Sequence, residues 1–154
     1  MKVLFVCLGN ICRSPMAQGV FQKIVDDHGL TESYEISSAG TNPFMFGHHF
    51  HKNTLAILEQ NGINLEGRSR TVDYDDLVFF DHILALDTSV QTDLLDLDIK
   101  KEFVHKIQCL MEYATNPPAV LDVPDPYYGG IEGFEHSYKL ISDCCKNLFE
   151  KVNK

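Results

Sequence analysis

The start of the chain limits the fold more than any other segment, because an apolar strand passes directly into a helix. Val3–Cys7 is a continuous apolar run with β-branched and aromatic members, a pattern typical of a strand buried on both faces. Gly9 and Asn10 interrupt this run. Pro15 suits the first turn of a helix, and Ser14 is the expected cap of that helix. A buried strand followed at once by a helix predicts a parallel sheet covered by helices.

The same alternation of strands and helices continues along the chain. Further strands are expected at 34–38, 82–86 and 103–110, and helices at 15–29, 52–60, near 88–97 and at 134–152. Residues 123–130 contain two prolines and two glycines and are expected to form a loop. The 154 residues correspond to one domain, 1–154. We therefore predict a single-domain α/β fold with a central parallel sheet of about four strands and helices on both faces.

Charge and cysteine content exclude several functions and locations. The 13 basic and 22 acidic residues give a net charge of −9, which argues against binding to nucleic acid or to anionic membranes. No apolar run approaches the roughly 20 residues of a membrane span, so no membrane insertion is expected. Five cysteines, an odd number, fit a secreted disulfide framework poorly, and the short apolar start does not have the pattern of a signal peptide. We expect a cytoplasmic protein.

Residues 7–15 read Cys-Leu-Gly-Asn-Ile-Cys-Arg-Ser-Pro and predict a phosphate-binding loop after the first strand. Ligands of parallel α/β folds bind at the carboxyl ends of the strands, and a helix N-terminus favours an anion there. Gly9 is expected to supply a backbone geometry that other residues resist. Arg13 can hold two phosphate oxygens, and Cys7 would lie at the floor as a nucleophilic thiolate. Because the arginine and the backbone amides supply positive charge, no metal or cofactor is expected.

Asp125 is a second candidate for catalysis. It stands between Pro124 and Pro126, which restrict the backbone and so give its carboxyl group a defined place. Hydrolysis of a phosphate monoester requires a proton on the leaving oxygen. We therefore interpret Asp125 as a general acid that acts together with the cysteine and the arginine.

Several motifs together resemble a known family, the low-molecular-weight protein tyrosine phosphatases, over essentially the whole chain. The matching segments are Val6–Ala17, Ser37–Thr41, Phe80–Ile83, Asp87 and Asp125–Gly129. The resemblance implies that Cys7 forms a phosphocysteine and that Arg13 binds the phosphoryl group and stabilises its transition state. It also implies that Asp125 protonates the leaving phenol oxygen and then helps water to attack the phosphoenzyme.

The same resemblance implies further site residues. The substrate-binding residues it implies are Leu8, Gly9, Asn10, Ile11, Cys12, Ser14, Phe44, Tyr127 and Tyr128. Asn10, Ser14 and Ser38 are expected to support the loop. Cys12 is a candidate redox partner, because a reversible disulfide with Cys7 would protect the nucleophile against over-oxidation.

The substrate is expected to be a tyrosine-phosphorylated protein, and three alternatives remain. Relatives that hydrolyse phosphoarginine tend to carry Thr at the position of Ile11, so this residue favours phosphotyrosine. The alternatives are a phosphoarginine phosphatase, a thioredoxin-linked arsenate reductase, which needs two further cysteines close together, and a phosphate-binding module without activity. A cognate tyrosine kinase acting at Tyr127 or Tyr128 is a further candidate partner.

Two segments depart from the family pattern. His51-Lys52-Asn53 stands where the family often has an Asp-Pro-Arg type of run, and Gly67 stands where many members carry a histidine that braces the loop. Three histidines within residues 48–51 suggest a metal by composition, but no matching carboxylate or cysteine cluster accompanies them. We therefore expect surface histidines and no metal site.

Overall fold

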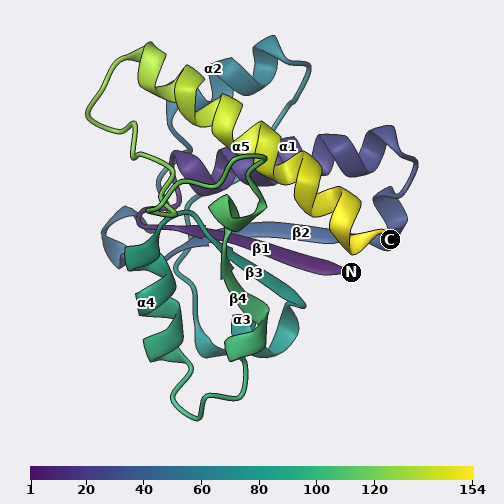
Figure 1. Cartoon of the computed structure of the whole chain (residues 1–154). Helices are drawn as coiled ribbons and strands as arrows, with labels where there is room; N and C mark the ends of the chain where they lie inside the picture. The colour runs from purple at the N-terminus through teal and green to yellow at the C-terminus, as the bar shows by residue number, and fades with distance from the viewer.

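A four-stranded parallel sheet forms the centre of the molecule, with strand order β2-β1-β3-β4, in a computed structural model that describes all 154 residues (Figure 1). The strands are β1 (Lys2–Cys7), β2 (Glu35–Gly40), β3 (His82–Ala85) and β4 (Ile107–Cys109). The helices are α1 (Arg13–Asp27), α2 (Lys52–Gln60), α3 (Tyr74–Phe79), α4 (Thr88–Leu97) and α5 (Ile131–Val152). The predicted single-domain α/β fold is confirmed.

Strand β1 lies inside the sheet and contributes to a core on each face. Val3 and Phe5 pack into the core formed with α1, α2 and α5, whereas Leu4 and Val6 pack into the core formed with α3 and α4 (Figure 1). Successive side chains of a strand point to opposite faces, so a continuous apolar run requires cover on both. The carboxyl end of β1, where Cys7 lies, points away from both chain termini (Figure 1).

Helix α5, which the sequence predicts over 134–152, buries an apolar stripe. Phe134, Ile141, Cys145 and Leu148 on this 22-residue helix are fully buried in the core that contains α1 and α2. None of the helices, α5 included, combines the length and the apolar composition that crossing a bilayer requires.

Two elements differ from the sequence prediction. The fourth strand was expected over 103–110 but is limited to Ile107–Cys109, because short 3-10 turns at 104–106 and 110–113 precede and follow it. Helix α3 was not predicted, since six residues are too few to display a helical period. Its signal is the capping box in which Asp73 and Asp76 each bind the backbone of the other.

The expected cap of the first helix was wrong. Helix α1 begins at Arg13, and the capping position belongs to Cys12, whose side chain makes no capping hydrogen bond. Ser14 lies within the first turn, with its hydroxyl directed at Cys7. Pro15 is tolerated there because the first amides of a helix have no intrahelical acceptor. A serine that could have capped the helix instead contributes to the site.

Candidate active site

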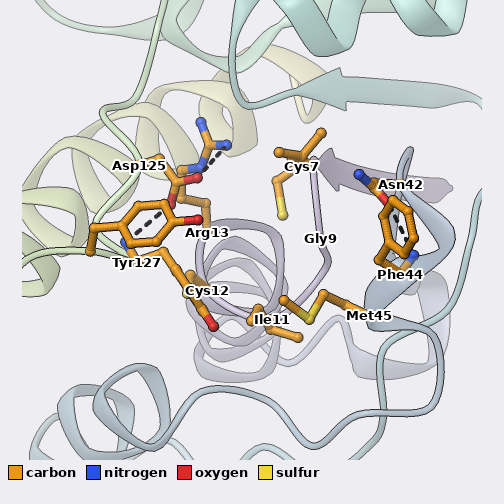
Figure 2. Close-up of a pocket in the computed structure, with 12 residues that line it drawn as sticks. Cys7, Gly9, Ile11, Cys12, Arg13, Asn42, Phe44, Met45, Asp125 and Tyr127 are labelled. Atoms are coloured by element: carbon orange, nitrogen blue, oxygen red, sulfur yellow. Dashed lines mark hydrogen bonds and ion pairs between the residues drawn. The ribbon is translucent and has the colours of Figure 1, made fainter.

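A cavity of about 220 Å³ opens at the carboxyl end of β1 (Figure 2). It is bounded by the cysteine loop, which we define as residues 7–14, by residues 42–45 after β2 and by the 123–130 loop. The lining residues are Cys7, Leu8, Gly9, Ile11, Cys12, Arg13, Asn42, Phe44, Met45, Asp125, Tyr127 and Tyr128. Most of the site residues expected from the sequence therefore meet at one pocket. Asn42 and Met45 were not expected, although they follow the end of a strand, where such sites form.

Cys7 forms the floor of this pocket. Only 3% of the residue is exposed, because it is the last residue of a central strand. Its sulfur lies 2.9 Å from the Ser14 hydroxyl and accepts a hydrogen bond of 3.2 Å from the backbone N–H of Asn10. A thiolate at this position can accept both hydrogen bonds, and the charge strengthens them.

Asn10 takes the left-handed backbone conformation that was expected of Gly9. Its φ is 55°, whereas Gly9 does not have a positive φ. The Asn10 carboxamide donates to the hydroxyls of Ser14 and Ser38, both at 2.9 Å, and accepts from the backbone N–H of Arg70 at 3.0 Å. Asparagine tolerates this conformation better than other residues with side chains. The structure therefore places Asn10 and Ser14 behind the sulfur of Cys7, where they support the loop, and not on the pocket wall.

The segment 67–71 braces the cysteine loop from outside. The Ser69 hydroxyl donates to the Gly9 carbonyl at 3.0 Å. The guanidinium of Arg70, whose backbone holds Asn10, binds both oxygens of Asp76 at 3.0 Å. Gly67 leaves no side chain for this task, so Ser69 and Arg70 perform it. Sequence reasoning missed both residues because neither belongs to a motif with a recognisable chemistry.

Gly40 allows β2 to lie against the cysteine loop. A Cβ atom at this position would come within 2.8 Å of the Leu8 carbonyl oxygen and 3.0 Å of the Asn10 amide nitrogen. Both atoms belong to the backbone and cannot turn aside. The close approach of strand and loop therefore requires glycine here.

Arg13 is buried and charged at the side of the pocket. Its Nη1 donates to Asp87 Oδ2 at 2.7 Å and to the Val123 carbonyl at 2.9 Å, while Nη2 lies 3.6 Å from Asp125 Oδ2. Burial alone would lower the pKa of Arg13, but Cys7, Asp87 and Asp125 act against it, so the pKa is raised. The guanidinium is held in place by one nitrogen, which leaves Nη2 and Nε for an anion.

Asp87 has two roles. It caps α4, since Oδ1 accepts from the Val90 backbone N–H at 2.7 Å. Its other oxygen holds Arg13. The position directly after β3 is a signal for such a residue, because parallel strands end at one edge of the sheet.

Asp125 reaches the pocket from the 123–130 loop. Its side chain is 42% exposed, and Oδ1 accepts from the backbone N–H of Tyr127 at 3.1 Å. Figure 2 shows Asp125 beside Arg13, on the side of the cavity where Tyr127 also lies. A carboxyl group at this position can exchange a proton with a group bonded to a phosphate held by Arg13.

Aromatic side chains stand on opposite sides of the cavity. Tyr127 and Phe44 face each other across it, with Cys7 between them (Figure 2). Tyr128 is 95% exposed and packs its ring edge-on against Tyr127, with ring centroids 4.8 Å apart. Ile11 contributes an apolar surface lower in the pocket. Such a slot suits a flat aromatic group whose end reaches the floor.

Two of the five cysteines line the pocket, and all five are free thiols. Burial, followed by the nearby Cys7 and Asp125, raises the pKa of Cys12 to about 12, so Cys12 is a neutral thiol at neutral pH. The others lie in β4 (Cys109) and α5 (Cys144 and Cys145), away from the pocket lining. The pocket thus lacks the additional pair of cysteines that the arsenate reductase alternative requires.

Two of the three histidines near residue 50 have separate local partners. A ring nitrogen of His48 lies 3.0 Å from the Met45 carbonyl, and His51 caps α2 through its Nδ1. The structure contains no group of three or more His, Cys, Asp or Glu side chains that could hold a metal ion.

Comparison with known proteins agrees with this geometry. A family model described as low molecular weight phosphotyrosine protein phosphatase matches residues 2–154. The low molecular weight protein-tyrosine-phosphatase of Bacillus subtilis is 38% identical over 155 residues, covering 100% of this chain and 97% of the relative. A crystal structure of protein tyrosine phosphatase from Entamoeba histolytica, with Hepes in the active site, has a TM-score of 0.93 at 38% identity and covers 99% of this chain and 97% of that one. A Drosophila arginine phosphatase also has a TM-score of 0.93, at 29% identity, covering 100% of this chain and 99% of that one.

Proposed function

Since the chain belongs to the low molecular weight phosphotyrosine protein phosphatase family, we propose that it hydrolyses phosphotyrosine through a phosphocysteine formed on Cys7. One observation carries the proposal: a buried sulfur with two hydrogen-bond partners shares a pocket with Arg13 and Asp125. A nucleophile, a cation for the phosphoryl oxygens and an acid for the leaving group are the parts that this reaction requires.

In the first step, the Cys7 thiolate attacks phosphorus in line with the ester oxygen. The S–P bond forms while the P–O bond to the phenol breaks. Arg13 and the backbone amides of the cysteine loop bind the phosphoryl oxygens and stabilise their charge. Asp125 transfers its proton to the leaving oxygen, so that a neutral phenol departs.

In the second step, water hydrolyses the phosphocysteine. Asp125, now a carboxylate, accepts a proton from the water as its oxygen attacks phosphorus, and the S–P bond breaks. Inorganic phosphate leaves, the thiolate is restored and Asp125 is protonated again. The Ser14 hydroxyl and the Asn10 N–H stabilise the departing thiolate, because both are directed at the sulfur.

The pocket walls support an aromatic phosphoester as substrate. The slot between Phe44 and Tyr127 accepts a flat ring, and Ile11 presents no hydroxyl to it. A tyrosine-phosphorylated protein would insert its phosphorylated side chain, with the exposed Tyr128 left to contact neighbouring residues. The enzyme is also expected to accept small aryl phosphates.

Phosphoarginine is a second candidate substrate because of the structural likeness to the Drosophila arginine phosphatase. A phosphoarginine side chain brings a charged guanidinium group, which needs polar partners that Ile11 and Phe44 do not offer. Paired peptides that carry phosphotyrosine or phosphoarginine at one position distinguish the two activities by the ratio of their kcat/KM values. We expect the phosphotyrosine peptide to be preferred.

The mechanism is tested by hydrolysis of para-nitrophenyl phosphate in the presence of a chelator. We expect turnover in the natural chain, none in Cys7→Ser, and a strongly reduced kcat in Asp125→Ala. Rapid quenching with a labelled substrate should trap one phosphate per chain, and this label should be absent from Cys7→Ser. Turnover that survives Cys7→Ser would exclude the cysteine mechanism. Binding of phosphopeptide without turnover by the natural chain would instead favour a binding module.

Cys12 is part of the proposal as a redox partner. A peroxide would oxidise the Cys7 thiolate to a sulfenic acid and leave as water or an alcohol. The Cys12 thiol would then attack that sulfur, forming the disulfide and releasing water. A thiol reductant restores both cysteines, so we place the enzyme in the reducing cytoplasm. Phosphorylation of the exposed Tyr128 by a tyrosine kinase is compatible with its position at the pocket mouth.

A further inference from the structure

His51 closes the N-terminus of α2 in a way that fixes the tautomer of its neutral ring. The backbone N–H of Asn53 donates to Nδ1 of His51 at 3.1 Å. A backbone N–H can act only as a donor, so Nδ1 carries the lone pair and the proton of the neutral ring is on Nε2. A protonated ring would lose this hydrogen bond and would place a positive charge at the positive end of the helix dipole.

The same ring packs against a pocket wall. Its centroid lies 5.9 Å from that of Tyr127, with the planes at 77°, and 4.7 Å from that of the buried Phe134 on α5, at 31°. Tyr127 in turn holds the Asp125 carboxylate through its backbone N–H. One side chain on α2 thus contacts both α5 and the 123–130 loop.

The start of α2 is also tied to the cysteine loop. The backbone N–H of His51 donates to the Ile11 carbonyl at 2.8 Å, and the Thr54 hydroxyl donates to the Cys12 carbonyl at 3.0 Å. These bonds fix the position of His51 relative to the pocket floor. The ring of His51 is thereby placed in contact with Tyr127 at the side of the pocket.

We propose that neutral His51 is a positioning residue that holds Tyr127 against one side of the pocket, and that protonation of its ring releases Tyr127. The proposal rests on the phosphatase activity proposed above. According to this proposal, the departure from an Asp-Pro-Arg type of run at residues 51–53 affects substrate binding. A carboxylate could cap the helix equally well, but it offers no ring to Tyr127.

The surroundings of His51 favour the neutral ring. Burial and then Lys52 lower the pKa of His51 below its usual value, so the neutral ring is the form present at pH 7. The titratable groups on the adjoining segments are Lys52 and Glu59 on α2, Cys7, Cys12 and Arg13 on the cysteine loop, and Asp125, Tyr127 and Tyr128 on the 123–130 loop. The first turns of α5 carry Glu132, Glu135, His136, Tyr138 and Lys139, and the residue of this helix that stacks on the His51 ring is the uncharged Phe134.

Two substitutions separate the ring from the cap. His51→Asn keeps an acceptor for the N-terminus of α2 but removes the ring, and the asparagine side chain stays uncharged at every pH of the series. At pH 7 we expect its KM for para-nitrophenyl phosphate to rise about three- to ten-fold, with kcat within two-fold. His51→Phe keeps the ring and removes the cap. We expect a lower Tm for it but a KM close to that of the natural chain. An unchanged KM in His51→Asn, or an equal rise in both variants, would overturn the proposal.

A pH series tests the proposal through a KM ratio that loss of packing alone would not make dependent on pH. The KM ratio between His51→Asn and the natural chain should shrink towards one as the pH is lowered from 7 through the midpoint of the His51 titration, because the natural enzyme itself loses the contact on protonation. The ratio also cancels the titration of the substrate and of the other catalytic groups. A ratio that stays constant over this range contradicts the proposal.

Nuclear magnetic resonance of the natural chain tests the geometry without any turnover. We expect two-bond nitrogen–proton correlations to show the Nε2–H tautomer of His51, and the ring signals of Tyr127 to titrate with the same midpoint as His51. A proton on Nδ1, or Tyr127 signals that ignore this titration, would overturn the proposal. Absence of para-nitrophenyl phosphate hydrolysis in the natural chain would instead contradict the proposed function, which keeps the two failures distinct.

Discussion

The floor and the rim of the pocket are built differently. The floor, residues 7–14, is buried except for Leu8 and the partly exposed Gly9, and the side chains of Asn10, Arg13 and Ser14 all make hydrogen bonds within the protein. The rim consists of exposed side chains, with Phe44 at 85% and Tyr128 at 95% exposure. The difference indicates that the nucleophile Cys7 and the phosphate-binding Arg13 are fixed by burial and hydrogen bonding, whereas the general acid Asp125 and the aromatic groups that contact the substrate are open to solvent.

The contrast has a physical origin. A buried polar group without a partner costs about 1–3 kcal/mol, so each group in the floor needs a defined neighbour and a defined position. Preorganised groups of this kind need not reorient as charge develops during the reaction. The rim has no such requirement, because water satisfies its polar atoms. His51 is the exception, since it ties the rim residue Tyr127 to the floor.

The largest of these effects on kcat/KM is expected for a substitution in the floor that preserves charge. Arg13→Lys keeps a cation but loses the planar fork that binds Asp87 and Val123 while leaving nitrogen atoms for phosphate. We expect kcat/KM for para-nitrophenyl phosphate to fall about 10³-fold. The matched control is Arg68→Lys, since Arg68 is exposed and donates only to the Gly47 carbonyl. A loss below ten-fold in Arg13→Lys would show that the fork is dispensable.

The second largest effect is expected for the difference in reactivity between the two thiols of the floor, Cys7 and Cys12. With a pKa raised to about 12, Cys12 should react with iodoacetamide at pH 7 at least about 100-fold more slowly than Cys7. Mass spectrometry of the digested protein locates the adduct, and Cys7→Ser should leave this segment unlabelled. Phosphate should protect Cys7. Rapid labelling of Cys12 at neutral pH would contradict the raised pKa.

The same shift has a consequence for stability. The pKa of the folded Cys12 lies above the ordinary thiol value of 9.0, so its contribution to stability is fully present below about pH 9. It is lost as pH rises towards 12, because the unfolded thiol ionises first. We expect the free energy of unfolding to decline over this alkaline range.

A smaller effect is expected for the brace outside the floor. Ser69→Ala removes the donor to the Gly9 carbonyl, so the free energy of unfolding should fall by about 1–2 kcal/mol. We expect kcat to decrease by a few-fold, because the cysteine loop loses one of its supports. Urea denaturation and steady-state kinetics measure the two effects. Ser89→Ala, at an exposed position of α4, is the control and should change neither.

The smallest effect is expected at the rim. Phe44→Ala removes an exposed ring whose backbone is held independently by the Asn42 side chain, so the loop should keep its shape. We expect KM for aryl phosphates to rise about two- to five-fold, with kcat and Tm unchanged. A large fall in kcat would mean that Phe44 contributes to the chemical step and not only to substrate binding, which would contradict this assignment.

Sequence patterns were informative where local chemistry and packing agree. The apolar run of β1 and the stripe of α5 predicted a sheet covered on both faces, because burial selects apolar side chains at a fixed period. The pattern failed for α3 and for most of the fourth predicted strand. These elements are short, and neighbours distant in the chain decide where they end.

By itself, the sequence determined the α/β class, the position of Cys7 and Arg13 between a strand and a helix, and the aspartate held between two prolines. Each of these follows from residues close together in the chain. Only the tertiary structure decided that Asn10 takes the left-handed conformation and that the Ser14 hydroxyl lies within hydrogen-bond distance of the Cys7 sulfur. It also decided that Ser69 and Arg70 brace the loop and that His51 reaches Tyr127. Hydrogen bonds and ring contacts between residues up to 76 positions apart depend on how the elements pack, and no local pattern records that.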